Sequence, residues 1–219
     1  MAKKKIKIWS EEELILTFHL ERKDDSYFLL SDWLDAQATP MVAYEQALFN
    51  QLLSDAKKGA DFWNEETLKM RFISPLLTVL VQIDKDDQNR YESFYDKEIS
   101  ATVEGIYLQT ETDFMLAKGI GDIAQTPYFH FQEYKRSRKS PPEPMAQLVE
   151  AFLIAQEKNK NGKPLYGLTI TGRNWHFVVM EGKKYAVSRT FDATQKEDLL
   201  KIIAVLRKFK VILETTLLD

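Results

Sequence analysis

The spacing of apolar residues divides the chain into helical and strand-like segments. Between residues 63 and 82 apolar side chains recur every three or four positions, which predicts an amphipathic helix. Asn64 suits the cap position at its start, and Pro75 predicts a bend or a break within it. Similar but weaker patterns predict helices over 41–57 and 195–208.

Three strand-like runs with short turns between them follow the first strong helix: 94–104, 106–117 and 128–135. A helix over 144–158 and an apolar strand over 165–171 come next. The short turns predict an antiparallel meander for the first three strands. The helical crossover requires the third and fourth strands to be parallel, so we expect a mixed sheet with a helix on each face.

Both ends of the chain add to this core. Residues 6–35 contain two short apolar runs that fit either strands or helices, and residues 174–189 predict a hairpin. The predicted fold class is therefore α/β, with a mixed central sheet flanked by helices. We expect an N-terminal extension over 1–60, packed on a domain over 61–219 that ends in the hairpin and the last helix.

Composition narrows the class of protein. The 219 residues are 44% hydrophobic and 29% charged, as in globular proteins. No apolar run reaches the roughly 18 residues of a membrane span, and the basic N-terminus lacks the apolar segment of a secretory signal. Cys is absent, which excludes disulfides, thiolate zinc sites and Cys nucleophiles. This fits the reducing cytoplasm, which is the expected location.

Charge is distributed unevenly along the chain. The net charge is −3, yet residues 133–189 hold 11 Lys and Arg against 5 Asp and Glu. Such a basic block can attract a polyanion to one face. The alternative interpretation is a set of solvated, Lys-rich turns.

Candidate chemistry is concentrated between Asp113 and Lys135. Asp113 lies in one strand-like run, and Glu133 and Lys135 lie two residues apart in the next. Residues i and i+2 of a strand point to the same face, so Glu133 and Lys135 should project together beside Asp113. Two carboxylates and an ammonium can hold Mg²⁺ and orient a water against a phosphodiester. Alternatively, Glu133 and Lys135 are a solvated ion pair on an edge strand.

This order of elements, with Asp on the second strand and Glu-x-Lys on the third, resembles the PD-(D/E)xK nuclease superfamily. Within it, the chain looks more closely like the N-terminal nuclease portion of type I restriction-enzyme R subunits and related small bacterial proteins. Four segments carry the likeness: NEETLKMRFISPLL, ETDFMLA, FHFQEYK and MAQLVEAFLIAQ. The likeness covers about residues 60–190 and implies a restriction-endonuclease-like αβββαβ core. Thr112 stands where the superfamily name has Pro, and the chain has no Walker motif.

The resemblance implies a nuclease that hydrolyses DNA with Mg²⁺, for which Mn²⁺ can substitute, in restriction or defence. Asp113, Glu133 and the backbone carbonyl of Tyr134 would bind the metal. Lys135 would position the attacking water or stabilise the developing negative charge. Glu65 would add a carboxylate from the first core helix, although a plain role in the first turn of that helix also explains it.

Three further expectations concern residues around this site. Glu66 competes with Glu65 for the role on the helix, and Gln147 would hydrogen-bond near the site unless it is a surface residue. Phosphate contacts are expected from a basic segment that could equally be a solvated loop: Arg136, Arg138 and Lys139.

Two other hypotheses remain beside the nuclease. One is a non-catalytic binding or assembly module on the same fold. Residues 1–132 favour it, because 14 Lys and Arg against 23 Asp and Glu make poor DNA-binding material. The other is a homodimer or a larger restriction-like complex in which a partner supplies sequence recognition.

Overall fold

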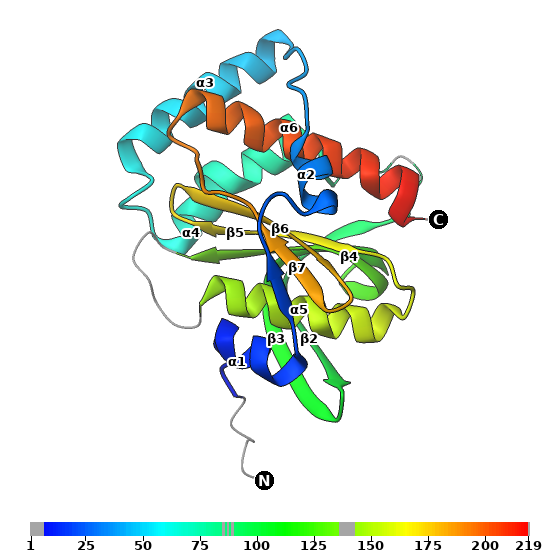
Figure 1. Cartoon of the computed structure of the whole chain (residues 1–219). Helices are drawn as coiled ribbons and strands as arrows, with labels where there is room; N and C mark the ends of the chain where they lie inside the picture. The colour runs from blue at the N-terminus through cyan, green and yellow to red at the C-terminus, as the bar shows by residue number, and fades with distance from the viewer. Residues whose placement is uncertain (1–6, 85, 87, 89, 136–142, 219) are drawn as a thin grey trace.

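The computed structural model describes residues 7–84, 86, 88, 90–135 and 143–218. The chain is mixed α/β, with one central sheet that carries helices on both faces (Figure 1). This confirms the predicted fold class at the level of a mixed sheet flanked by helices. Within the described residues, no helix is both long and apolar enough to cross a membrane.

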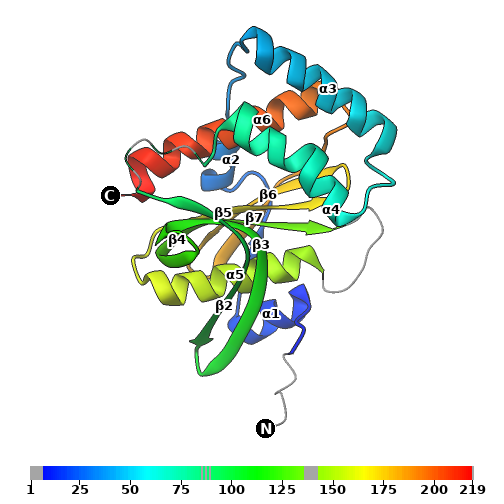
Figure 2. The same ribbon diagram turned by 180° about the vertical axis from the view of Figure 1, so that it is seen from behind.

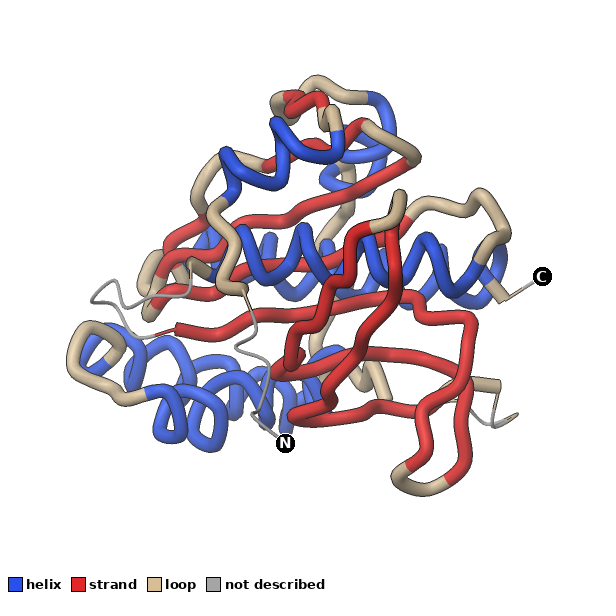
Figure 3. Tube along the Cα trace, turned by 90° about the horizontal axis from the view of Figure 1, so that it is seen from below, coloured by secondary structure: helices blue, strands red, loops and turns tan. Residues whose placement is uncertain are grey.

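The sheet has eight strands: β1 Glu21–Lys23, β2 Glu92–Val103, β3 Ile106–Ile120, β4 Ile123–Lys135, β5 Leu165–Thr171, β6 Asn174–Glu181, β7 Lys184–Val187 and β8 Phe191–Asp192. Their order is β1-β7-β6-β5-β4-β3-β2, and β8 pairs with β6. The strands, drawn red in Figure 3, follow one another across the molecule. The antiparallel meander of β2, β3 and β4 and the parallel pairing of β4 with β5 are confirmed.

The helices are α1 Glu11–Phe18, α2 Phe28–Leu34, α3 Ala43–Gly59, α4 Glu65–Leu68, α5 Pro144–Asn159 and α6 Lys196–Ile212, with π-helical segments η1 Lys69–Ile73, η2 Leu76–Val81 and η3 Leu213–Leu217. The Asn64 cap is confirmed, since its side-chain oxygen accepts a hydrogen bond from the Thr67 N–H at 2.7 Å. Pro75 stands just before η2, where its missing N–H removes one helical hydrogen bond.

Two hydrophobic cores lie on opposite faces of the sheet. One face packs against α5 with α1 beside it, and the other packs against α2, α3, α6 and the α4–η2 helix (Figure 2). Residues of β5 alternate between them, because successive side chains of a strand point to opposite faces. Tyr166 and Leu168 belong to the α6 side, whereas Leu165 belongs to the α5 side.

The segment before the core contributes to both layers. Where the sequence pattern left 6–35 open, the structure has two helices with a short strand between them. That strand, β1, pairs in parallel with β7 and so extends the sheet. The Trp33 indole N–H of α2 donates a hydrogen bond to the Val205 carbonyl of α6 at 2.9 Å. Residues of this N-terminal segment are therefore integrated with the C-terminal helix.

Gly167 sets how closely α5 can approach the sheet. A Cβ there would lie 2.7 Å from the Phe131 carbonyl oxygen and 2.9 Å from the Leu148 and Phe152 side chains. We expect Gly167→Ala to lower the free energy of unfolding by about 1–3 kcal/mol, because the backbone contact cannot relax. Chemical denaturation measures this, and an unchanged unfolding midpoint would contradict the packing of α5.

Candidate functional site

The candidate residues gather where β3 and β4 separate. Their pairing ends at Phe114 opposite Gln132, so Asp113 and Glu133 stand opposite one another one residue further on. The Asp113 carboxylate lies in the gap, where its Oδ2 accepts a hydrogen bond from the Tyr134 backbone N–H at 2.7 Å. Both backbone groups of a strand residue point to the same edge, so the Tyr134 carbonyl also faces this gap.

Glu133 is buried without a hydrogen-bond partner. Its side chain is 0% exposed, and neither carboxyl oxygen has a partner among the described residues. Burial raises the pKa of Glu133 well above its ordinary value, and the nearby Asp113 carboxylate raises it further, against the opposing ammonium of Lys135. Glu133 therefore keeps its proton at pH values at which an exposed Glu has lost it.

Glu65 connects the helix to the two lysines of the site. From the first turn of α4, its Oε2 lies 3.8 Å from the Lys135 Nζ and its Oε1 lies 3.7 Å from the Lys69 Nζ. Glu66, the other candidate on this turn, is exposed to solvent. The structure thus brings together Asp113, Glu133, Lys135 and Glu65.

Lys69 and Asp96 belong to the same cluster, although the sequence pattern did not single them out. The Lys69 Nζ lies 2.7 Å from the Asp113 Oδ1 and 3.3 Å from the Asp96 Oδ1. Burial lowers the pKa of Lys69, but the two carboxylates more than offset this and raise it above its ordinary value. The only sequence signal for Lys69 is its spacing of four residues from Glu65.

Asp96 stands at an irregular point of β2. The pairing of β2 with β3 passes from Tyr95–Phe114 to Lys97–Thr112 and leaves Asp96 without a registered partner. Its φ is 49°, in the left-handed region that Asp tolerates better than most residues. This local twist places an acid next to Lys69 at the rim of the site.

Gln147 lines a hollow between α5 and the strands β2 and β3. The hollow has a volume of about 190 Å³ and is also lined by Gln109, Glu111 and Glu150. Glu111 precedes Asp113 by two residues on β3, so both face the same side of the sheet. Glu150 accepts a hydrogen bond from the Gln109 N–H at 3.2 Å, and burial raises its pKa to about 7. The side-chain oxygen of Gln147 has no hydrogen-bond partner in the described part of the chain.

The basic segment expected to contact DNA lies outside the described residues: Arg136, Arg138 and Lys139. Another basic residue lies at the same end of the sheet. The Gly172 N–H donates a hydrogen bond to the Lys135 carbonyl at 3.1 Å, so the β5–β6 turn with Arg173 is directly beside the end of β4.

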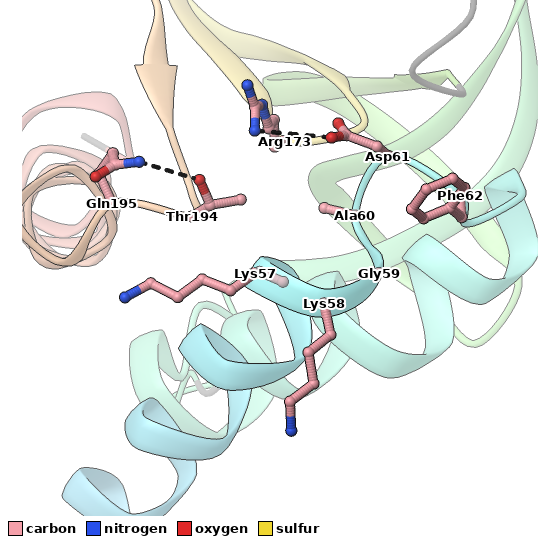
Figure 4. A pocket seen from close by; sticks show the side chains of 10 residues that line it. Lys57, Lys58, Gly59, Ala60, Asp61, Phe62, Arg173, Thr194 and Gln195 are labelled. Carbon is pink, nitrogen blue, oxygen red and sulfur yellow. Dashed lines mark hydrogen bonds and ion pairs between the residues drawn. The ribbon is translucent and has the colours of Figure 1, made fainter.

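Arg173 lines a second hollow, which has a volume of about 290 Å³. In Figure 4 its guanidinium and the Asp61 carboxylate point toward each other, at 3.7 Å. The Lys57 side chain extends from the end of α3 toward the start of α6, and Phe62 at the rim is 87% exposed. The hollow therefore combines cationic groups with an accessible aromatic ring.

Among the described residues, no group of three or more His, Cys, Asp or Glu side chains is arranged to hold a metal ion. The gap between β3 and β4 nevertheless offers oxygens of Asp113 and Glu133, and those of Glu133 have no other partner. Mg²⁺ is commonly bound through one or two carboxylates and keeps several waters. This donor set fits such an ion, although Lys69 holds one Asp113 oxygen.

Sequence comparisons assign no family to the chain. No protein-family profile matches it, and no curated protein shows significant similarity. The resemblance to PD-(D/E)xK nucleases therefore stays an expectation drawn from the sequence motifs.

Glu133 makes folding stability depend on pH. Its folded-state pKa is raised, so its contribution to stability is complete below the pKa of an exposed Glu, about 4.3, and is lost as the pH rises above it. Glu133→Gln removes this titration. We expect the variant to gain stability over the wild type as the pH rises above about 4.3, by up to about 1.4 kcal/mol per pH unit until the folded-state pKa is passed. Urea denaturation with a chelator present measures it; a pH-independent difference would contradict the burial of a titrating carboxyl.

Proposed function

We propose that the protein is a Mg²⁺-dependent nuclease that hydrolyses phosphodiester bonds of DNA, in restriction or defence, on a restriction-endonuclease-like core. The element order supports this. The helix from α4 to η2, the strands β2, β3 and β4, the helix α5 and the parallel strand β5 follow the αβββαβ sequence. The candidate residues lie on the second and third strands of that series, where the resemblance expects them.

One observation carries the proposal: Asp113 and a buried, partnerless Glu133 face each other where β3 and β4 separate. A divalent ion would supply the positive charge that these carboxylates require. Asp113, Glu133 and the Tyr134 carbonyl would hold it. When bound, such an ion lowers the pKa of a coordinated water and neutralises charge on the scissile phosphate.

The lysine of the Glu-x-Lys strand has a distinct task. Lys135 lies two residues from Glu133 on the same face of β4, and Glu65 lies 3.8 Å from its ammonium and restricts its orientation. An ammonium in this position stabilises the negative charge that develops on the phosphate oxygens during hydrolysis. Glu65 thereby acts as a positioning residue.

The hollow lined by Lys57 and Arg173 supports DNA as the substrate. It lies beside the end of β4, so a strand that occupies the site would pass over it. Cationic side chains bind backbone phosphates, and exposed aromatic rings such as Phe62 stack with bases.

A second candidate function is a non-catalytic module that uses the same fold for binding or assembly. The observation in its favour is the Lys69 ammonium, which lies 2.7 Å from Asp113 and supplies a positive charge without any metal. In such a module Lys69 would hold the site closed permanently.

Cleavage of supercoiled plasmid DNA with Mg²⁺ or Mn²⁺ separates the two functions. We expect Asp113→Asn and Lys135→Met each to reduce the cleavage rate by about 100-fold or more, because each removes a charge at the reacting phosphate. Lys158→Met, at an exposed position of α5, is the matched control and should retain wild-type activity. Cleavage that persists in both site variants would refute the assignment, and an inactive wild type would favour the non-catalytic module.

Arg173→Ala should weaken DNA binding independently of hydrolysis. With a chelator present, we expect lower affinity for labelled duplex DNA and a log–log salt slope reduced by about 0.9, the loss of one phosphate contact. Fluorescence anisotropy over a salt series measures both. Arg22→Ala is a matched control, since Arg22 of strand β1 is similarly exposed and is paired with Glu11 of helix α1. If Arg173→Ala and Arg22→Ala change the affinity and the salt slope equally, the hollow does not contact DNA.

A further inference from the structure

Lys69 occupies the position that a cation would take between the acids of the site. Its Nζ lies within 4 Å of three carboxylates: 2.7 Å from Asp113, 3.3 Å from Asp96 and 3.7 Å from Glu65. Tyr134 closes one side, with its ring centroid 5.7 Å from the Nζ. The ammonium thus neutralises the same carboxylate that the proposed function assigns to a metal ion.

A divalent ion at Asp113 would compete with this ammonium in the present arrangement. The Oδ2 of Asp113 is held by the Tyr134 N–H, and its Oδ1 is held by Lys69. Mg²⁺ binds carboxylate oxygens at about 2.0–2.1 Å, so an ion on the Asp113 oxygen that Lys69 contacts would lie less than about 5 Å from the ammonium. Two positive charges at that separation repel strongly in a partly buried site.

The exposure of its partners shows where the ammonium can go. The Asp113 side chain is 12% exposed, that of Glu65 is 33% exposed and that of Asp96 is 65% exposed. A Lys side chain that leaves Asp113 therefore keeps two acidic partners nearer to solvent. Leu68, which precedes Lys69, is buried in the core, so the backbone stays fixed while the long side chain moves.

We propose that Lys69 is the counter-ion of the metal-free site and that a divalent ion displaces it from Asp113 toward Asp96 and Glu65 at the rim. This inference rests on the proposed function, because it assumes a metal at Asp113. Lys69 thus sets how tightly the site binds a divalent ion.

Metal binding without DNA tests the proposal. Lys69→Met keeps the aliphatic chain and removes the competing charge. By isothermal titration with MnCl₂, we expect the variant to bind Mn²⁺ about tenfold or more tightly than the wild type. The metal-free variant should melt at a lower temperature, because its carboxylates lose their counter-ion, and Mn²⁺ should raise its melting temperature by more than that of the wild type.

Three further variants make the result specific. Lys69→Arg keeps the charge and should bind Mn²⁺ with affinity close to the wild type. Lys97→Met removes a lysine that contacts Asp122 outside the site, and its affinity should not change. Glu133→Gln combined with Lys69→Met should abolish binding, which places the ion at the proposed carboxylates. Lys69→Gln replaces Lys69→Met if that variant does not fold.

The outcomes separate the two proposals. Equal or weaker Mn²⁺ binding by Lys69→Met, with clear binding by the wild type, would overturn the role of Lys69 and leave the metal site intact. No Mn²⁺ binding by the wild type and by the Lys69 variants at millimolar concentration would overturn both the role of Lys69 and the proposed metal-dependent function.

Discussion

The separation of β3 from β4 beyond the Phe114–Gln132 pair is the constraint on which the site depends. In a continuous ladder the Tyr134 N–H would bond to the backbone of β3. Here it bonds to the Asp113 side chain, and Glu133 is buried opposite with no partner. The α4–η1 helix brings Glu65 and Lys69 to the charged groups that the strands place at this gap.

The charged side chains around this gap determine what it can bind. Glu65 joins Lys69 to Lys135, and Lys69 joins Glu65 to Asp113, whereas the buried carboxyl of Glu133 has no hydrogen-bond partner among the described residues. A buried carboxyl without a partner is costly to ionise and contributes little to folding. Buried groups with perturbed pKa values concentrate at functional sites, where a bound ligand can supply the missing interaction partner. Among the described residues, no cation is bound to the Glu133 carboxyl, whereas Lys69 supplies the positive charge beside Asp113.

The sequence predicted the core of the fold because local patterns there agree with tertiary structure. Alternating apolar residues and short turns gave the meander, and the helix from Pro144 required the parallel crossover. The strand β1 was not foreseen, since three polar residues carry no periodic pattern. Asp113, Glu133 and Lys135 could be selected from strand order and two-residue spacing. Lys69 and Asp96 could not, because only the packing of a helix against the sheet brings them to Asp113.

A crystal of the protein soaked in MnCl₂ would show whether an ion replaces Lys69 at Asp113. We expect an anomalous difference peak between the Asp113 and Glu133 carboxylates, with the Lys69 Nζ withdrawn from Asp113. A crystal without such a peak, in which Lys69 still contacts Asp113, would contradict this expectation.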